Sequence, residues 1–273
     1  MCRLATGAGP VSVSTLPSLP QAELKALRTL KTRGERERQG LFLAEGDHLT
    51  GESIQEGKAL RLLVAAGQEQ RYARHLDSGI ASFTISEKSL AMLCDTRTPQ
   101  GVMAVCALPP EPGLAALGPR MVALNGVQDP GNVGTILRTM DAAGFTGMLM
   151  DTACADAFSP KALRASMGAA FRIPVRVTDD LPQDLGLLEG YVLLAAALDG
   201  TPFYQRSPVG PRLCVLIGSE GAGLAPEVAA MATQRLRLPM PGRAESLNAA
   251  VAASIIIYDL LREQQAREQT PDR

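Results

Sequence analysis

The sequence predicts an α/β protein of two domains, and three observations lead to that prediction. Apolar strand-like runs alternate with helical runs along most of the chain, which is the pattern of strands joined by helices. Prolines and glycines interrupt the alternation over 109–119, which is typical of a linker. The length of 273 residues suits two ordinary domains. We therefore expect a small α/β domain over 21–108, a linker over 109–119, and a parallel-sheet domain over 120–265.

In the first domain, short apolar runs indicate strands and the segments between them indicate helices. The expected strands are Leu41–Ala44, Leu60–Ala65, Ser82–Ile85 and Val102–Leu108. The expected helices between them are Leu49–Gln55, Gln68–Leu76 and Glu87–Cys94.

The second domain repeats the alternation, beginning with a buried-strand run. The expected strands are Met121–Asn125, Gly147–Asp151, Ile173–Val177, Tyr191–Ala197 and Leu213–Ile217. Because helical segments separate them, we expect a mostly parallel sheet covered on both faces.

The composition excludes several classes of protein. Five cysteines stand singly, without a C-x-x-C pair, and there are only two histidines. We therefore expect no metal site and no disulfide framework, and a cytoplasmic location. The longest apolar stretch, Ala249–Leu261, is shorter than a membrane span of about 20 residues, so no membrane partner is expected. Residues 1–20 are expected to form a flexible tail without signal-peptide character, and 266–273 a disordered one.

The net charge of −1 hides a basic segment near the N-terminus. Leu24, Leu27 and Leu30 repeat at helical spacing and predict one amphipathic helix with a positive polar side. The basic residues on this segment are Lys25, Arg28, Lys31, Arg33, Arg36 and Arg38. Phosphate contact and an ordinary solvated helix face are both open interpretations.

A first candidate for chemistry is the segment Asn125–Arg138, which leads from a strand end through a Gly/Pro turn into a helix. Asn132 is a good N-cap and Gly144 a good C′ residue. Arg138 is expected on the side of the helix opposite its apolar stripe. The segment suits either an ordinary capped helix or a ligand loop beyond a strand end.

A second candidate is Leu216–Leu224, which also follows a strand. Its glycines at 218, 221 and 223 do not match G-x-G-x-x-G, so a dinucleotide fingerprint is disfavoured. Glycines here allow a backbone to approach a ligand closely. Glu220 is either solvated or bound to a polar ligand group.

A third candidate is Leu238–Asn248, which leads into the helix Ala249–Arg262. Ser246 or its neighbour is expected to cap this helix. The helix is apolar almost all round, which indicates burial on every face. Asn248 is either a satisfied core amide or a functional group.

In this order, the three segments resemble the three motifs of the SpoU/TrmH family of SPOUT RNA methyltransferases. The matching strings are DPGNVGTILRTMDAAGF, VLIGSEGAGL and LPMPGRAESLNAAVAASI, with SPKALRASMGAAFRIPV between the first two. In the first half, TLKTRGERERQGLFLAEGDHL and TRTPQGVMAV resemble the L30e-like substrate-binding domain that often precedes this catalytic domain.

The resemblance implies a parallel α/β sheet whose C-terminal segment forms a deep trefoil knot, a rare exception to normal chain topology. It also implies a homodimer and the cofactor S-adenosylmethionine. The implied reaction is methyl transfer to a ribose 2′-hydroxyl of structured RNA, with 23S ribosomal RNA the expected substrate. With such a substrate, RNA contact is expected from the basic residues Lys25, Arg28, Lys31, Arg33, Arg36 and Arg38.

The resemblance also assigns residues. It implies that Gly218, Leu238, Leu247, Ile217 and Met240 bind the cofactor. It places Arg138, Asn132, Glu220, Ser246 and Asn248 at the catalytic positions. Because a guanidinium stays protonated in proteins, we expect Arg138 to hold RNA phosphate and stabilise the developing alkoxide rather than act as a base.

Three alternatives remain distinct from this interpretation. One is the same reaction on transfer RNA. Another is a non-catalytic RNA-binding or ribosome-assembly protein that kept the fold, which predicts losses at Arg138, Glu220 or Asn248 that the sequence does not show. The last is a dinucleotide-dependent oxidoreductase, for which the glycine spacing is wrong.

Overall fold

A computed structural model describes residues 16–269 and divides the chain into two compact units at Leu108/Pro109. In the first unit the helices are α1 (Gln21–Thr29), α2 (Arg33–Gln39), α3 (Asp47–Gln55), α4 (Ala73–Leu76) and α5 (Glu87–Leu93). Its strands are β1 (Leu41–Glu45), β2 (Ala59–Ala65), β3 (Ser82–Ile85) and β4 (Val102–Ala107).

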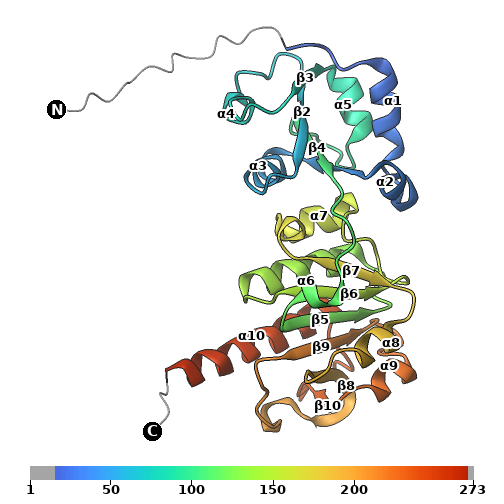
Figure 1. The fold of residues 1–273 in the computed structure, drawn as a ribbon, viewed down its shortest axis with the longest axis vertical. Helices are drawn as coiled ribbons and strands as arrows, with labels where there is room; N and C mark the ends of the chain where they lie inside the picture. The colour runs from blue at the N-terminus through green and yellow to red at the C-terminus, as the bar shows by residue number, and fades with distance from the viewer. Residues whose placement is uncertain (1–15, 270–273) are drawn as a thin grey trace, which may run out of the picture. The chain divides into compact units, whose positions relative to one another are not determined.

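Within the described residues, the first unit has a mixed four-stranded sheet in the order β1-β4-β2-β3. β4 runs antiparallel to β1 and β2, and β2 runs parallel to β3. Helices α1 and α5 lie on one side of this sheet and α3 on the other (Figure 1). Apolar side chains of α1 and α5 pack on Leu43, Leu63 and Met103 of the sheet, and this packing forms the core of the unit.

The basic segment is not one helix, as the sequence predicted, but two. α1 ends at Thr29, Leu30 is buried, and α2 begins at Arg33. The guanidinium of Arg36, itself 3% exposed, donates to the Leu30 carbonyl oxygen at 2.7 Å. A helix leaves its last carbonyls without intrahelical partners, so Arg36 serves the end of α1. Assigning Arg36 to RNA contact was therefore wrong, because its side chain is inside the unit.

The N-terminal tail also differs from the prediction within the described residues. Ser18 forms a β-bridge with Thr84, and Leu19 is buried in the core with the leucines of α1. Residues 16–20 therefore belong to the folded unit, and residues 1–15 lie outside the described part of the chain.

The second unit carries the strands of a larger sheet. These are β5 (Arg120–Asn125), β6 (Gly147–Asp151), β7 (Val175–Thr178), β8 (Val192–Pro202), β9 (Leu213–Gly218) and β10 (Gln234–Arg237). Its α-helices are α6 (Pro130–Ala142), α7 (Pro160–Ser166), α8 (Leu181–Gly186), α9 (Pro226–Ala230) and α10 (Ala249–Glu268). Its 3₁₀ turns are η1 (Leu114–Leu117), η2 (Ala169–Phe171) and η3 (Phe203–Gln205).

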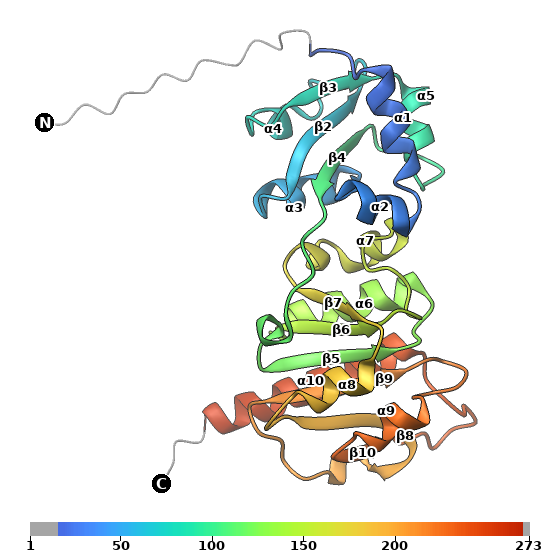
Figure 2. The same cartoon turned by 45° about the vertical axis from the view of Figure 1, so that its right-hand side comes forward.

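The described strands of this unit form a six-stranded sheet in the order β10-β8-β9-β5-β6-β7, with every pairing parallel. This confirms the parallel-sheet prediction. Helices α8 and α9 cover one face, where Leu181, Leu185 and Val228 pack on the strands. Helices α6 and α10 lie on the other face (Figures 1 and 2). The trefoil knot stays a prediction.

Several boundaries in this unit differ from the predicted ones. β8 extends to Pro202 and β7 begins at Val175, and β10 was not predicted. The second half of the predicted linker is structured, because Leu117 is fully buried in the core. α10 continues to Glu268, so residues 266–268 are helical rather than part of a disordered tail. No helix within residues 16–269 is long and apolar enough to cross a membrane.

The sheet brings the carboxyl ends of its central strands to one edge. β5 and β9 pair in register up to Asn125 and Gly218, so the loops that follow them start side by side. The Asn125 side chain joins three of these ends, because its Nδ2 donates to Asp151, the last residue of β6, at 2.6 Å and its Oδ1 accepts from Ala225 in the segment after β9 at 2.7 Å. Ligands of open α/β sheets bind at this edge.

Candidate active site

The loop after β9 is a tight turn that requires glycine. The backbone groups of Ser219 and Gly223 exchange hydrogen bonds at 3.0 and 2.9 Å, and Gly223 has a φ of +70°. A Cβ on Gly218 would lie 2.1 Å from the carbonyl carbon of Gly223. The glycines of this motif therefore fold the loop onto itself, and the fold of the loop leaves Glu220 exposed at its tip.

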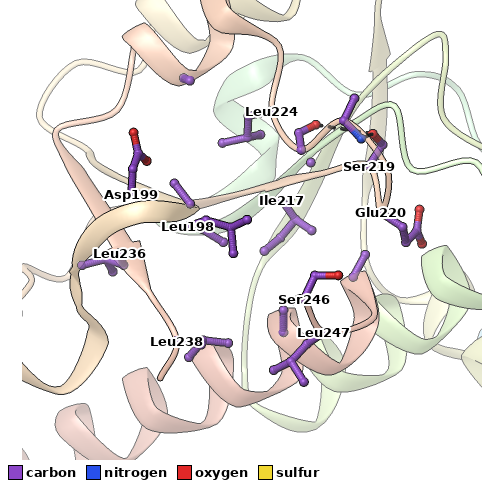
Figure 3. Close-up of a pocket in the computed structure, with 18 of the residues that line it drawn as sticks. Leu198, Asp199, Ile217, Ser219, Glu220, Leu224, Leu236, Leu238, Ser246 and Leu247 are labelled. Carbon is purple, nitrogen blue, oxygen red and sulfur yellow. Dashed lines mark hydrogen bonds between the residues drawn. The ribbon is translucent and has the colours of Figure 1, made fainter. Parts of the chain in front are cut away.

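Beside this loop lies a cavity of about 620 Å³. Its wall includes all five residues that the resemblance assigned to the cofactor, namely Ile217, Gly218, Leu238, Met240 and Leu247. Glu220 and Ser246 also line it (Figure 3). The second and third motifs therefore meet at this cavity, the second at the end of β9 and in the loop after it and the third in the segment before α10. Its volume is within the range of small-molecule sites.

Three of the predicted polar residues form one hydrogen-bonded chain. Nδ2 of Asn248 donates to Oδ1 of Asn132 at 3.0 Å, and Nδ2 of Asn132 donates to Glu220. The direction of the chain is set by α10, because Oδ1 of Asn248 accepts from the backbone N–H groups of Ala250 and Val251. An amide whose oxygen is occupied in this way can offer only its NH₂ group to the next residue. The N-terminus of α10 thus orients Asn132 toward the Glu220 carboxylate.

The structure corrects both predicted helix caps. The N-cap of α6 is Asp129, which accepts from Gly131 at 2.7 Å, with Pro130 in the first turn. Asn132 lies inside the first turn, so its side chain is available for the chain described above. α10 is capped by Asn248 and not by Ser246, because Ser246 lies two residues earlier on the cavity wall. The C′ position of Gly144 after α6 is confirmed by its φ of +70°.

Arg138 lies apart from the other predicted catalytic residues. It is exposed on α6, about two turns beyond Asn132. Its guanidinium makes no hydrogen bond or ion pair with any residue in the described range 16–269. A charged group that the fold itself does not use is available to an anionic ligand.

Sequence reasoning missed one wall of the cavity. Ala196–Asp199 of β8 and Arg235 and Leu236 of β10 line it, and Asp199 pairs with Arg235 at 2.8 Å. β10 has only four residues with little apolar pattern. The Asp199-Gly200 pair inside an otherwise apolar run is the signal that could have indicated an interrupted strand.

A buried cysteine, Cys154, packs against the loop after β5. The Cys154 sulfur accepts from the Val127 backbone at 3.3 Å, beneath the loop after β5. Burial raises the pKa of this thiol to about 12, so the nucleophilic thiolate is scarce at neutral pH. The site therefore presents carboxylate, amide, hydroxyl and guanidinium groups.

In the first unit the predicted basic residues other than the buried Arg36 fall into two groups. Lys25, Arg28 and Lys31 are exposed and make no hydrogen bond or ion pair with another described residue. Arg33 pairs with Glu37, and Arg38 with Glu35, each at 2.7 Å. Hydrogen bonds from Arg38 and Gln39 lower the pKa of Glu35 to about 2, so Glu35 stays ionised and offsets the charge of Arg38.

Models of two protein families match the chain. The SpoU rRNA Methylase family matches residues 119–258, and an MRM3-like substrate binding domain matches residues 21–104. Among curated proteins, the 23S rRNA (guanosine(2553)-2'-O)-methyltransferase RlmP of Bacillus subtilis is 35% identical over 90% of this chain and 98% of its own length. The mitochondrial rRNA methyltransferase 3 of Homo sapiens is 28% identical over 89% of this chain and 73% of its own.

Solved structures agree in fold. The SpoU methyltransferase AviRb from Streptomyces viridochromogenes, in complex with AdoMet, superposes with a TM-score of 0.81 at 27% identity, over 90% of this chain and 99% of its own. An AdoMet-bound rRNA methyltransferase from Sinorhizobium meliloti gives 0.78 at 31% identity, over 91% and 97%. The match of residues 119–258 includes all six strands of the parallel sheet and all three motifs, so the chain belongs to the SpoU rRNA methylase family.

Proposed function

We propose that this protein transfers a methyl group from S-adenosylmethionine to a ribose 2′-hydroxyl of 23S ribosomal RNA. One observation carries the proposal: the cavity of about 620 Å³ is lined by every residue assigned to the cofactor, and Glu220 on its wall is joined to Asn132 and Asn248. The relative from Bacillus subtilis, whose name states this reaction on 23S rRNA, supports it over 90% of this chain.

The cavity suits S-adenosylmethionine by charge and by surface. Three carboxylates, of Asp199, Glu220 and Glu245, line it against the single guanidinium of Arg235, which favours a cationic ligand. Apolar side chains such as Leu238 and Leu247 supply the remaining wall, as expected for a pocket that holds a nucleoside. When bound, this cofactor supplies a methyl group on a positively charged sulfur.

The polar residues at and near the cavity have separate roles in positioning the loops and binding the RNA. Glu220, oriented by Asn132 and Asn248, keeps the loop after β9 and the start of α10 in register. Ser246 offers its hydroxyl at the cavity wall. The unpaired guanidinium of Arg138 binds an RNA phosphate and stabilises the negative charge that develops on the ribose 2′-oxygen during methyl transfer, with the hydroxyl proton released to water.

We assign RNA binding in the first unit to Lys25, Arg28 and Lys31. These side chains are exposed and unpaired within the described chain, and phosphate contacts of this kind position an RNA without reading its sequence. The matched substrate-binding domain over 21–104 supports this assignment.

We also propose that the protein acts as a homodimer in the cytoplasm. α10 was predicted to be buried on every face, but Val251 and Tyr258 are 47% and 51% exposed in the single chain. An apolar helix face of this kind favours a second subunit. The four described cysteines are free thiols, in keeping with a reducing compartment.

The reaction is tested with tritium-labelled S-adenosylmethionine and unmodified 23S rRNA and tRNA transcripts, followed by mapping of 2′-O-methyl groups. We expect label at one ribose of 23S rRNA. Label on a base, or on tRNA alone, would contradict the proposed reaction or substrate. If S-adenosylhomocysteine fails to bind in calorimetry, the cofactor assignment itself is wrong.

A further inference from the structure

β8 is interrupted where it borders the cavity. Ala195 of β8 pairs with Arg235 of β10, and the next pair is Thr201 with Leu236. Two adjacent residues of β10 therefore pair with residues of β8 that are six positions apart. On its other edge, β8 pairs with β9 only as far as Ala195. Residues 196–200 therefore form a bulge with no partner in the described sheet. Bulges of this kind re-aim side chains next to binding sites.

Two features hold the bulge in place. A Cβ on Gly200 would lie 2.5 Å from the Arg235 carbonyl carbon and the Leu236 nitrogen, so only glycine allows β8 to return to β10 there. Asp199, one residue earlier, pairs with Arg235 at 2.8 Å. The bulge is thus anchored at its end to β10, and its middle residue is Leu198.

Leu198 presents apolar surface to the cavity. Its side chain is 63% exposed, yet the residue lies on the cavity wall. In the view of Figure 3 it lies between Leu236 and Ile217. Covering an exposed leucine with a ligand removes apolar surface from water, which favours binding of that ligand. Leu187 at the end of α8 is 62% exposed but does not line this cavity, and it is therefore a matched control.

We propose that Leu198 is a further binding residue for the cofactor and covers its adenosyl half when the cofactor binds. This inference rests on the proposed function. The methionyl half of S-adenosylmethionine carries an ammonium and a carboxylate group, which need polar partners. Ile217 and Leu236 flank Leu198 on the cavity wall and suit the flat apolar face of a purine, whereas the charged Asp199 and Arg235 on the same wall pair with each other.

The test is calorimetric binding to the full-length protein and its Leu198→Ala, Leu198→Met and Leu187→Ala variants. The probes are S-adenosylhomocysteine and 5′-methylthioadenosine, because the second lacks the amino-acid end. We expect Leu198→Ala to weaken both probes by about 10-fold. Leu198→Met keeps the apolar volume and is expected to stay within about 3-fold of the parent, and Leu187→Ala is expected to change neither affinity.

The outcomes separate the two claims. Binding of both probes to the parent protein, with unchanged affinity in Leu198→Ala, overturns the role of Leu198 and leaves the cofactor assignment standing. Failure of the parent to bind either probe overturns both. A loss in Leu198→Ala that is seen with S-adenosylhomocysteine and absent with 5′-methylthioadenosine also overturns the adenosyl assignment. A dimer weakened by Leu198→Ala, with unchanged probe affinity, assigns Leu198 to subunit contact instead. Thermal melting checks that the variants fold.

Discussion

Asn248 takes part in two structures at once, and the two can be separated by substitution. Its Oδ1 caps α10 through Ala250 and Val251, while its Nδ2 donates to Asn132. Asn248→Asp keeps the accepting oxygen and adds a negative charge that a helix N-terminus favours, but it loses the donor. Asn248→Ala loses both the cap and the donor.

We therefore expect Asn248→Ala to lower the free energy of unfolding by about 1 kcal/mol and Asn248→Asp to leave it nearly unchanged. Methyl transfer is expected to fall by about 10-fold or more in both, because each breaks the hydrogen-bonded chain to Glu220. Denaturant melts and single-turnover rates measure the two effects. Full activity in Asn248→Asp would show that the hydrogen bonds from Asn248 through Asn132 to Glu220 have only a structural role.

Arg138 can be removed without loss of packing, because it is exposed and makes no hydrogen bond or ion pair with any described residue. We expect Arg138→Ala to melt like the parent and to bind S-adenosylhomocysteine equally well, while methyl transfer falls by about 100-fold or more. Arg138→Lys keeps the charge but not the planar fork and is expected to recover part of the rate. Near-normal turnover in Arg138→Ala would exclude this residue from the mechanism.

Individual residues show where the sequence was a sufficient guide. Ile217, Gly218 and Leu247 were assigned through motif order, and they line one cavity. Arg36 was assigned to RNA contact through its charge alone, and charge does not tell whether a side chain points to solvent or into the protein. Because α1 ends near Leu30, the Arg36 side chain turns inward and donates to the Leu30 carbonyl oxygen. The motif order therefore predicted which residues gather at one cavity, whereas charge alone misplaced a residue whose contacts depend on a helix end.

Close packing between α6 and α7 explains why the first motif has glycine at position 134, inside α6. In α6, a Cβ on Gly134 would lie 2.3 Å from the Ala162 carbonyl oxygen and 2.7 Å from the Ala165 Cβ in α7. We expect Gly134→Ala to push α6 from α7 and to lower the free energy of unfolding by about 1–3 kcal/mol. Equilibrium unfolding in urea measures this loss.

Gly131 in the same helix is the matched control. A Cβ there would approach only side-chain atoms, Asp129 Oδ1 at 3.1 Å and Lys161 Cε at 3.3 Å, which can shift. We expect Gly131→Ala to cost clearly less than Gly134→Ala. Equal losses in the two variants would mean that the α6–α7 contact does not set the need for glycine.

At the scale of elements, long apolar runs were predicted well and short polar ones were not. β5, β6 and β9 are buried strands with continuous apolar sequence, a pattern that parallel sheets produce. β10 reads Gln-Arg-Leu-Arg, buries only Leu236, and lies at the sheet edge. Its strand conformation comes from pairing with β8, which no local pattern records.

For the whole molecule, the division into two units follows from the proline-rich break after Leu108. The sequence alone could not predict which apolar surface stays exposed to solvent in the folded monomer. The all-apolar pattern of α10 predicts burial on every face, and the described chain covers only the side that includes Ala253, Ile257 and Leu260. The difference between the pattern and the monomer points to an interface.

That interface can be tested at Tyr258. Val251, Ile255 and Tyr258 are spaced so that they share one stripe of α10, and Tyr258 is 51% exposed. We expect the parent to sediment as a dimer at micromolar concentration and Tyr258→Glu to sediment as a folded monomer, because an interface core does not tolerate an unpaired charge. Leu187→Glu, at a residue 62% exposed on another element, is expected to remain dimeric.

The interface and the cavity are coupled through α10 itself. Ala249 and Ala252 line the cavity from the same helix that carries Val251 and Tyr258, so the stripe and the cavity wall are one rigid element. We therefore expect the Tyr258→Glu monomer to bind S-adenosylhomocysteine more weakly than the dimer, with an affinity that no longer depends on protein concentration. A parent protein that sediments as a monomer throughout would contradict the interface, and a Tyr258→Glu monomer with unchanged affinity would place the whole cofactor site within one subunit.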